Sequence, residues 1–232
     1  MEYAILFLPL FGSLVGYFGK SLANYFAEIS TCIFVSISAI LSMIVFWNGI
    51  QNGVYGNYII FEWISSGGFT ANWSINIDPL SSVMLVVVTF VSALVHIYSI
   101  GYMSHDPHKP RFMSYLSLFT FSMLALVVSD NFLQLFFGWE GVGLCSYLLI
   151  GFWYKKETAN NAAIKAFIVN RIGDFGLAIG IFLIFYFFGS INFNEVFSSV
   201  EDLADKKINF IVGEFNLITL ICIFLFIGAM GK

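Results

Sequence analysis

Long apolar stretches separated by short polar connections dominate the chain. A helix needs roughly 20 apolar residues to cross the hydrocarbon layer of a bilayer, which is about 30 Å thick. The stretches that meet or approach this length are residues 3–19, 29–47, 80–103, 112–128, 131–153, 162–188 and 215–232. The pattern predicts an all-α polytopic membrane protein with about seven transmembrane helices.

Two connections differ from the others in composition and in their pattern of polar and apolar residues. Residues 55–78 are aromatic and partly alternating around Ser65-Ser66-Gly67-Gly68. This pattern favours a small β-hairpin within a loop of about residues 51–79, with Trp63 and Trp73 near the lipid headgroups. An irregular interfacial loop is the alternative. The polar connection 189–214 has an amphipathic pattern around residues 193–200, where we expect a short turn.

Composition supports a membrane protein and excludes several other classes. Hydrophobic residues make up 59% of the chain and charged residues only 10%, against about 25% charged in a soluble domain. The cysteines, Cys32, Cys145 and Cys222, stand alone in apolar runs, and the chain has no glycine-rich phosphate loop or basic patch. We therefore expect no metal or cofactor in this chain and no nucleic-acid partner; the lipid bilayer is its expected environment.

The distribution of basic residues predicts the orientation in the membrane. One set of alternate connections carries Lys20, Lys109, Arg111, Lys155 and Lys156. The opposite set carries Lys206 and Lys207, both in an acidic segment. Because short inner loops are enriched in lysine and arginine, the first set is predicted to face inward. The N-terminus and the predicted hairpin then face outward.

Glu140 interrupts an otherwise uncharged apolar run. It lies about nine residues into the predicted helix, which is roughly 14 Å along the helix axis. An ionisable side chain at that depth is costly and commonly serves ion or proton movement. The small neighbours Gly138, Gly141 and Gly143 would allow close helix packing. A glutamate held permanently by hydrogen bonds to fix that packing is the alternative, and transport is the interpretation that we favour.

Arg171 and Asp174 lie three residues apart in the next apolar run, so they share one helix face and can pair. A purely structural salt bridge and a pair that tunes Glu140 electrostatically are both compatible with this spacing. Lys165, nearer the inner end of the same run, can extend its side chain to the interface.

His96 and Lys232 are the remaining ionisable candidates within apolar runs. His96 fits a buried neutral histidine bonded to a carbonyl, or a proton relay, because histidine titrates near physiological pH. By its place at the end of the last run, Lys232 fits a lysine that reaches the membrane surface. The small residues that precede it, Gly228-Ala229-Met230-Gly231, instead suit a tightly packed or broken helix at an ion site.

Several of these segments resemble the NuoL-type antiporter-like subunits of respiratory complex I, the NADH:quinone oxidoreductase. Residues 138–154 read GWEGVGLCSYLLIGFWY, and residues 161–177 read NAAIKAFIVNRIGDFGL. Residues 77–103 and the final GAMGK also resemble this family. The resemblance covers the chain from about Trp63 onward.

This resemblance implies a proton channel in an antiporter-like bundle built from inverted repeats. Glu140 and Lys232 match the glutamate and lysine of the family's proton-translocating pair, and Asp174 with Arg171 matches its tuning ion pair; His96 and Lys165 are possible relays. Residues 1–111 would form the first three helices with the outer loop, and residues 112–232 the start of the proton-translocating repeat. The later helices are missing, so the sequence would be an N-terminal portion.

The implied function is proton translocation coupled to NADH oxidation and quinone reduction in other subunits, which would hold the FMN and iron–sulfur clusters. Neighbouring membrane subunits of complex I would be its partners, in a bacterial plasma membrane or a mitochondrial inner membrane. In the proposed mechanism, changes in the pairing of Glu140 with Lys232 drive the proton. A subunit of a multisubunit Na+/H+ antiporter and a non-transporting scaffold remain alternatives.

Overall fold

The fold is known from a computed structural model that describes residues 1–19, 24–53, 55–210 and 213–232. The apolar helices are α1 (Glu2–Phe18), α2 (Asn24–Asn52), α3 (Pro79–Tyr102), α4 (Lys109–Val127), α5 (Phe132–Ile150), α6 (Glu157–Phe188) and α9 (Leu217–Gly231). Helices α2 to α6 are long and apolar enough to cross a membrane, whereas α1 and α9 are apolar but shorter, at 17 and 15 residues. The predicted all-α polytopic class is confirmed. Lys20, which was used to predict the orientation, lies outside the described residues.

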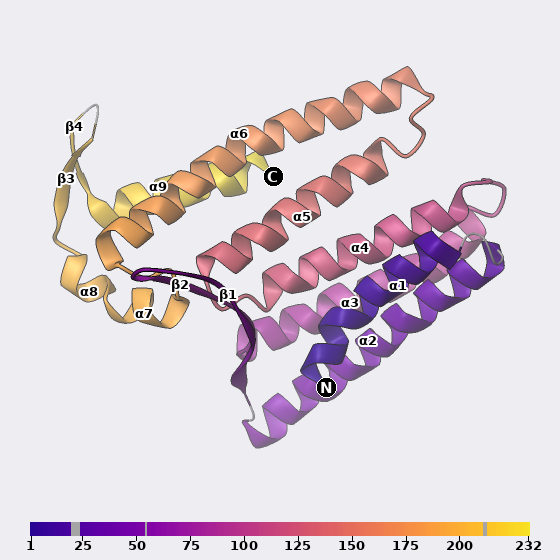
Figure 1. Ribbon diagram of the computed structural model, residues 1–232, viewed down its shortest axis with the longest axis horizontal. Helices are drawn as coiled ribbons and strands as arrows, with labels where there is room; N and C mark the ends of the chain where they lie inside the picture. The colour runs from indigo at the N-terminus through magenta and orange to yellow at the C-terminus, as the bar shows by residue number, and fades with distance from the viewer. Residues whose placement is uncertain (20–23, 54, 211–212) are drawn as a thin grey trace.

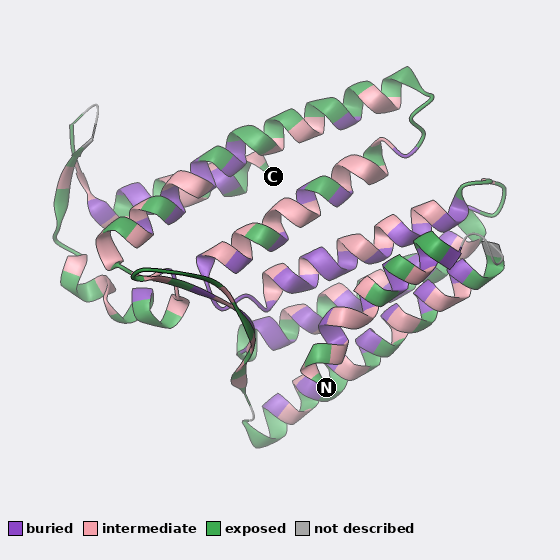
Figure 2. Ribbon diagram, in the orientation of Figure 1, coloured by how far each residue is buried: buried purple, intermediate pink, exposed green. Residues whose placement is uncertain are grey.

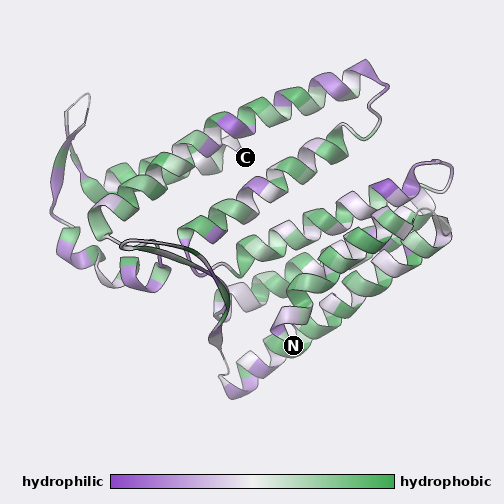
Figure 3. Cartoon of the chain, in the orientation of Figure 1, coloured by the Kyte–Doolittle hydropathy of each residue, from purple (hydrophilic) through white to green (hydrophobic). Residues whose placement is uncertain are grey.

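The helices run up and down as antiparallel neighbours (Figure 1). Helices α1 to α4 pack together, α5 lies between α4 and α6, and α6 makes its most extensive contact with α9. The connections from α3 to α4 and from α5 to α6 lie at one end of the molecule. Figure 3 shows mostly hydrophobic helices, with hydrophilic residues at the helix ends and at a few positions within α5 and α6.

The predicted β-hairpin is confirmed as β1 (Gly56–Ser66) paired antiparallel with β2 (Phe69–Ile77). The strands turn at Gly67, whose φ of 59° suits glycine. Trp73 is buried, with its ring centre 4.7 Å from that of Phe137 on α5, and its depth relative to the headgroups stays a prediction. The apolar face of β2 therefore covers the ends of the helices.

Side chains from the start of α5 bind the hairpin to the helices. Gln134 Nε2 donates to the backbone oxygen of Ser74 at 2.7 Å, and the Ser74 amide donates to Gln134 Oε1 at 3.0 Å. Asn131 Nδ2 donates to the backbone oxygen of Asn72 at 2.8 Å. These amides pair with the edge of β2, whose backbone groups would otherwise be buried without partners.

The connection between α6 and α9 holds more structure than its sequence predicted. The expected turn is present as α7 (Phe193–Ser198), followed by α8 (Val200–Leu203). A second hairpin, β3 (Lys207–Phe210) with β4 (Gly213–Asn216), was not predicted. The predicted last helix wrongly began at residue 215, because Phe215 continues the apolar run but pairs in β4. Asn216 caps α9, accepting a hydrogen bond from the Thr219 amide.

A buried ion pair joins α2 to α4. Lys109 Nζ lies 2.7 Å from Glu28 Oε2, and both side chains are largely buried. Both residues fell in predicted connections, where they would be hydrated. Each charge is therefore balanced by the other within the protein, so neither depends on hydration by water at these helix ends.

Glycines bring α6 and α9 into backbone contact. A Cβ atom added at Gly173 would lie 2.8 Å from the Gly231 Cα, and one added at Gly231 would lie 2.6 Å from the Gly173 Cα. One turn further along, Gly228 faces Leu177 in the same way. Small residues permit such close approach of membrane helices, where packing drives association. The glycine contact places the end of α9 against the middle of α6.

Gly173→Ala should separate α6 from α9, because the added methyl group meets backbone atoms that cannot move aside. Overpacking of this kind costs typically about 1–3 kcal/mol. We expect a lower midpoint of thermal unfolding, measured in detergent by tryptophan fluorescence. Gly68→Ala is the matched control, because no atom lies within 4 Å of its added Cβ. Equal midpoints for the two variants would contradict the assigned contact.

Candidate functional site

Four charged side chains gather where α5, α6 and α9 meet. Glu140 lies in the middle of α5, Arg171 and Asp174 lie on α6, and Lys232 follows the last residue of α9. Arg171 Nη1 donates to Glu140 Oε2 and lies 3.8 Å from Asp174 Oδ2. The pairing of Arg171 with Asp174 that the sequence spacing predicted is therefore present. The same guanidinium bridges both carboxylates.

Trp139 connects the other two members of this cluster. Its indole Nε1 donates to Asp174 Oδ1 at 2.7 Å, and its backbone oxygen accepts a hydrogen bond from Lys232 Nζ. The Lys232 ammonium also lies 4.9 Å from the centre of the Trp139 ring. The sequence analysis did not select Trp139. A signal was available, since a buried indole N–H needs an acceptor and the motif sets this tryptophan beside Glu140.

Lys232 has a different partner from the one expected. Among the residues that the structure describes, the ion pairs of Glu140 involve Arg171, and none joins it to Lys232. Lys232 instead binds the backbone of the residue next to Glu140. The glycine contact of α9 with α6 directs the lysine toward α5, which agrees with the alternative of a tightly packed helix at this position.

The glycines around Glu140 confirm the predicted close packing. A Cβ at Gly138 would lie 2.6 Å from the Leu126 amide nitrogen, and one at Gly141 would lie 2.8 Å from Ser122 Oγ, both on α4. Gly143 faces the other way, and a Cβ there would lie 3.1 Å from Lys232 Nζ. The three glycines thus hold α5 against α4 on one side and leave space for the lysine on the other.

The cluster is unevenly buried. Asp174 is buried, whereas the Glu140 side chain is 21% exposed and that of Arg171 is 45% exposed. A cavity of about 320 Å³ lies beside Glu140 and Arg171 and is lined by residues of α4, α5 and α6. The formal charges of the four groups cancel. The arrangement can therefore hold two carboxylates in an apolar setting while one of them adjoins open space.

His96 and Lys165 lie away from this cluster. His96 is buried on α3, its Nδ1 is 2.8 Å from the backbone oxygen of Ser92, and its Nε2 is 2.9 Å from Ser117 Oγ on α4. The contact with the Ser92 oxygen agrees with the interpretation of a buried histidine bonded to a carbonyl, and a role as a relay stays a prediction. Lys165 is exposed on α6, and it forms no ion pair with any residue of the described ranges.

Two family models match the chain. Residues 63–113 match the model described as NADH-ubiquinone oxidoreductase (complex I), chain 5 N-terminus. Residues 129–232 match the model described as NADH:quinone oxidoreductase/Mrp antiporter, TM. The second match contains all four members of the charged cluster.

Curated relatives resemble the chain along its whole length. NADH-quinone oxidoreductase subunit L of Rickettsia felis is 53% identical over 98% of this chain, and NADH-ubiquinone oxidoreductase chain 5 of Triticum aestivum is 55% identical over 100% of it. The chain spans 35% of the length of each of these relatives.

Solved structures share the fold at lower identity. The membrane-bound sulfane sulfur reductase, an archaeal respiratory membrane complex, contains a chain that matches with a TM-score of 0.77 at 15% identity; the match covers 98% of this chain and 33% of that one. The Mrp complex of Dietzia sp. DQ12-45-1b contains one with a TM-score of 0.75 at 20% identity, over 99% of this chain and 23% of that one.

These structures show the same fold of the membrane helices, and the second family model identifies it as antiporter-like. The relatives at more than 50% identity and the two family models agree on the group to which the sequence belongs. The chain belongs to the antiporter-like membrane subunit family of NADH:quinone oxidoreductase, whose members include subunit L and chain 5.

Proposed function

We propose that this chain carries part of a proton path in a membrane-bound NADH:quinone oxidoreductase. The observation that carries the proposal is the cluster of Glu140, Arg171, Asp174 and Lys232 within apolar helices. Charged groups at such depth are costly and typically serve ion or proton movement. The redox chemistry and its cofactors are assigned to other subunits of the complex. A neighbouring antiporter-like subunit is the proposed partner of this chain in the membrane. The membrane is a bacterial plasma membrane or a mitochondrial inner membrane, with the N-terminus outside.

In the proposed mechanism, Glu140 binds and releases the proton. When Glu140 takes a proton, its attraction for Arg171 weakens, and the guanidinium retains Asp174, at 3.8 Å, as its charged partner. When Glu140 loses the proton, Arg171 returns to it. The cavity beside Glu140 gives water or a neighbouring helix access to the carboxyl group. Arg171 thus acts as a switch between two carboxylates.

Lys232 completes the mechanism as a second cation that responds to Glu140. It is bound to the backbone oxygen of Trp139, which is the residue next to Glu140 on the same helix. A short movement of the lysine side chain therefore brings its ammonium toward the Glu140 carboxylate. In this position Lys232 can replace Arg171 as the partner of Glu140. The position of the Lys232 ammonium is thereby coupled to that of the Arg171 guanidinium on α6.

Sodium–proton exchange is the alternative within the same fold, since one matching family model also describes Mrp antiporters. A pH change that depends on sodium in vesicles without NADH would favour exchange. A proton gradient that depends on NADH and not on sodium supports the proposal. A scaffold without transport predicts that neutral substitutions at Glu140 and Asp174 alter assembly and leave proton flux unchanged.

Glu140→Gln should strongly reduce the number of protons moved per NADH oxidised, because an amide keeps the side-chain shape but cannot carry the proton. The measurement is NADH-driven acidification of membrane vesicles, normalised to NADH oxidation. Glu62→Gln, on the exposed face of β1, removes the same charge outside the helices and should pump normally. Normal pumping by the Glu140→Gln complex would disprove the role of this residue.

Charge balance predicts that substitutions at Arg171 and Asp174 compensate for each other. Arg171→Gln leaves two carboxylates with one cation, and Asp174→Asn leaves two cations with one carboxylate. We expect each single variant to lower the amount of assembled complex in membranes severalfold, and the double variant to recover at least about half of the native amount. Additive losses in the double variant would show that the two charges act independently.

A further inference from the structure

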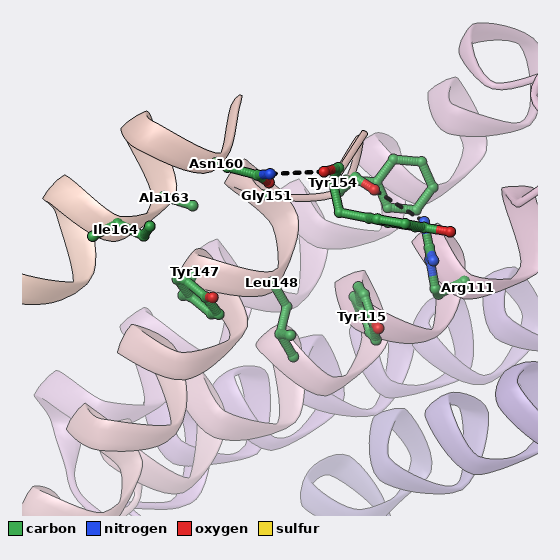
Figure 4. A pocket seen from close by; sticks show the side chains of 10 residues that line it. Arg111, Tyr115, Tyr147, Leu148, Gly151, Tyr154, Asn160, Ala163 and Ile164 are labelled. Atoms are coloured by element: carbon green, nitrogen blue, oxygen red, sulfur yellow. Dashed lines mark hydrogen bonds between the residues drawn. The ribbon is translucent and has the colours of Figure 1, made fainter. Parts of the chain in front are cut away.

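A second pocket lies at the end of the bundle where α3 connects to α4 and α5 connects to α6. Its volume is about 410 Å³, and residues of α4, α5 and α6 line it. Figure 4 shows Arg111 beside Tyr154 at one side of the pocket and Ala163 and Ile164 at the other; Asn160 Nδ2 joins the two sides by donating to the Tyr154 backbone oxygen at 2.7 Å. Tyr115, Tyr147 and Leu148 lie between the two sides. This pocket is separate from the Glu140 cluster.

The cation in this pocket is held in place but is not neutralised. Arg111 Nη2 donates to the backbone oxygen of Phe152 at 2.9 Å, and its guanidinium lies 4.6 Å and 5.3 Å from the ring centres of Phe152 and Tyr154. Its buried Nε has no hydrogen-bond partner. No carboxylate of the described ranges forms an ion pair with Arg111.

Asp106 is the carboxylate that interacts electrostatically with Arg111. Both of its oxygens already accept hydrogen bonds from other groups. The Trp153 indole donates to Asp106 Oδ2 at 2.9 Å, and the His108 amide donates to Oδ1 at 2.8 Å. Partial burial acts to raise the pKa of Asp106, but these hydrogen bonds and the electrostatic influence of His108 and Arg111 lower it below its usual value. Asp106 thus stays engaged with the loop and leaves the guanidinium available.

The position of the pocket indicates what kind of anion it takes. It lies at the helix ends, where Trp153 and Tyr154 form an aromatic belt of the kind found at a membrane interface. Lys155 and Lys156 follow in the same connection, and neither forms an ion pair within the described part of the chain. Leu148, Ala163 and Ile164 add an apolar wall. A small anion would make no favourable contact with an apolar wall, whereas a phospholipid has both a phosphate and acyl chains that can contact it.

From this combination we infer that the pocket binds the phosphate of an anionic phospholipid, with Arg111 as its ligand. A guanidinium suits a phosphate because two parallel N–H groups match two oxygens. Basic pockets between transmembrane helices at the inner surface bind lipid headgroups of this kind. The Arg111 guanidinium, which lines the pocket, receives the phosphate, and the apolar wall receives the start of an acyl chain. This site is independent of the proposed proton path.

The test is a titration of the purified protein in detergent with phosphatidylglycerol, with the one-to-one adduct measured by native mass spectrometry. Arg111→Gln should weaken the adduct about tenfold, whereas Lys155→Gln, which removes a charge at the same end but outside the pocket, should leave it within about twofold. Leu148→Trp fills the pocket and keeps the arginine, so it should also weaken the adduct about tenfold. Its thermal midpoint without lipid should match that of the native protein.

Several results would overturn the inference. Equal losses in Arg111→Gln and Lys155→Gln would indicate general charge attraction, and equal binding of phosphatidylcholine would remove the role of the anionic headgroup. Displacement of the lipid by millimolar inorganic phosphate would indicate a site for small anions. A photo-crosslinker at Tyr147 that captures a protein segment instead of lipid in native membranes would make the pocket a protein interface.

Discussion

The backbone contact of Gly173 with Gly231 governs the geometry of the charged cluster. Lys232, directly after α9, reaches the carbonyl of Trp139 because α9 lies against α6 with no side chain between them. The same glycine lies between Arg171 and Asp174, so the contact also fixes the face on which these charges are presented. Close packing in a membrane depends on small residues because no solvent drives the helices together.

Buried charges are paired in two different ways in this bundle. Glu28 and Lys109 form a pair that is largely covered on both sides, and nothing competes for either partner in the described structure. Such a pair fixes the position of two helices. Glu140, in contrast, shares its guanidinium with Asp174 and adjoins a cavity. Charges that have alternative partners and open space beside them can rearrange, which is what proton movement requires.

The two ends of the bundle also differ in construction. At one end, hairpins and short helices cover the helices, and side-chain amides such as Gln134 pair with the edge of β2 (Figures 1 and 2). At the other end, the connection from α5 to α6 carries Trp153, Tyr154, Lys155 and Lys156, and Arg111 lines the pocket beside it. Protein therefore covers one end, while the chemistry of the other suits contact with lipid headgroups.

The sequence by itself determined the membrane class and the spacing of Arg171 and Asp174. It left the segment after α2 open between a hairpin and an irregular loop, and it singled out Glu140 for the proposed proton path. Apolar length, strand alternation and helical spacing are local properties that can be read along the chain. Only the tertiary structure decided that Arg171 is the partner of Glu140, that Trp139 joins Asp174 to Lys232, and that Lys109 pairs with Glu28. These contacts depend on how closely helices that are distant in sequence approach each other. Glycine packing helps to set that distance, and a local sequence pattern does not predict it.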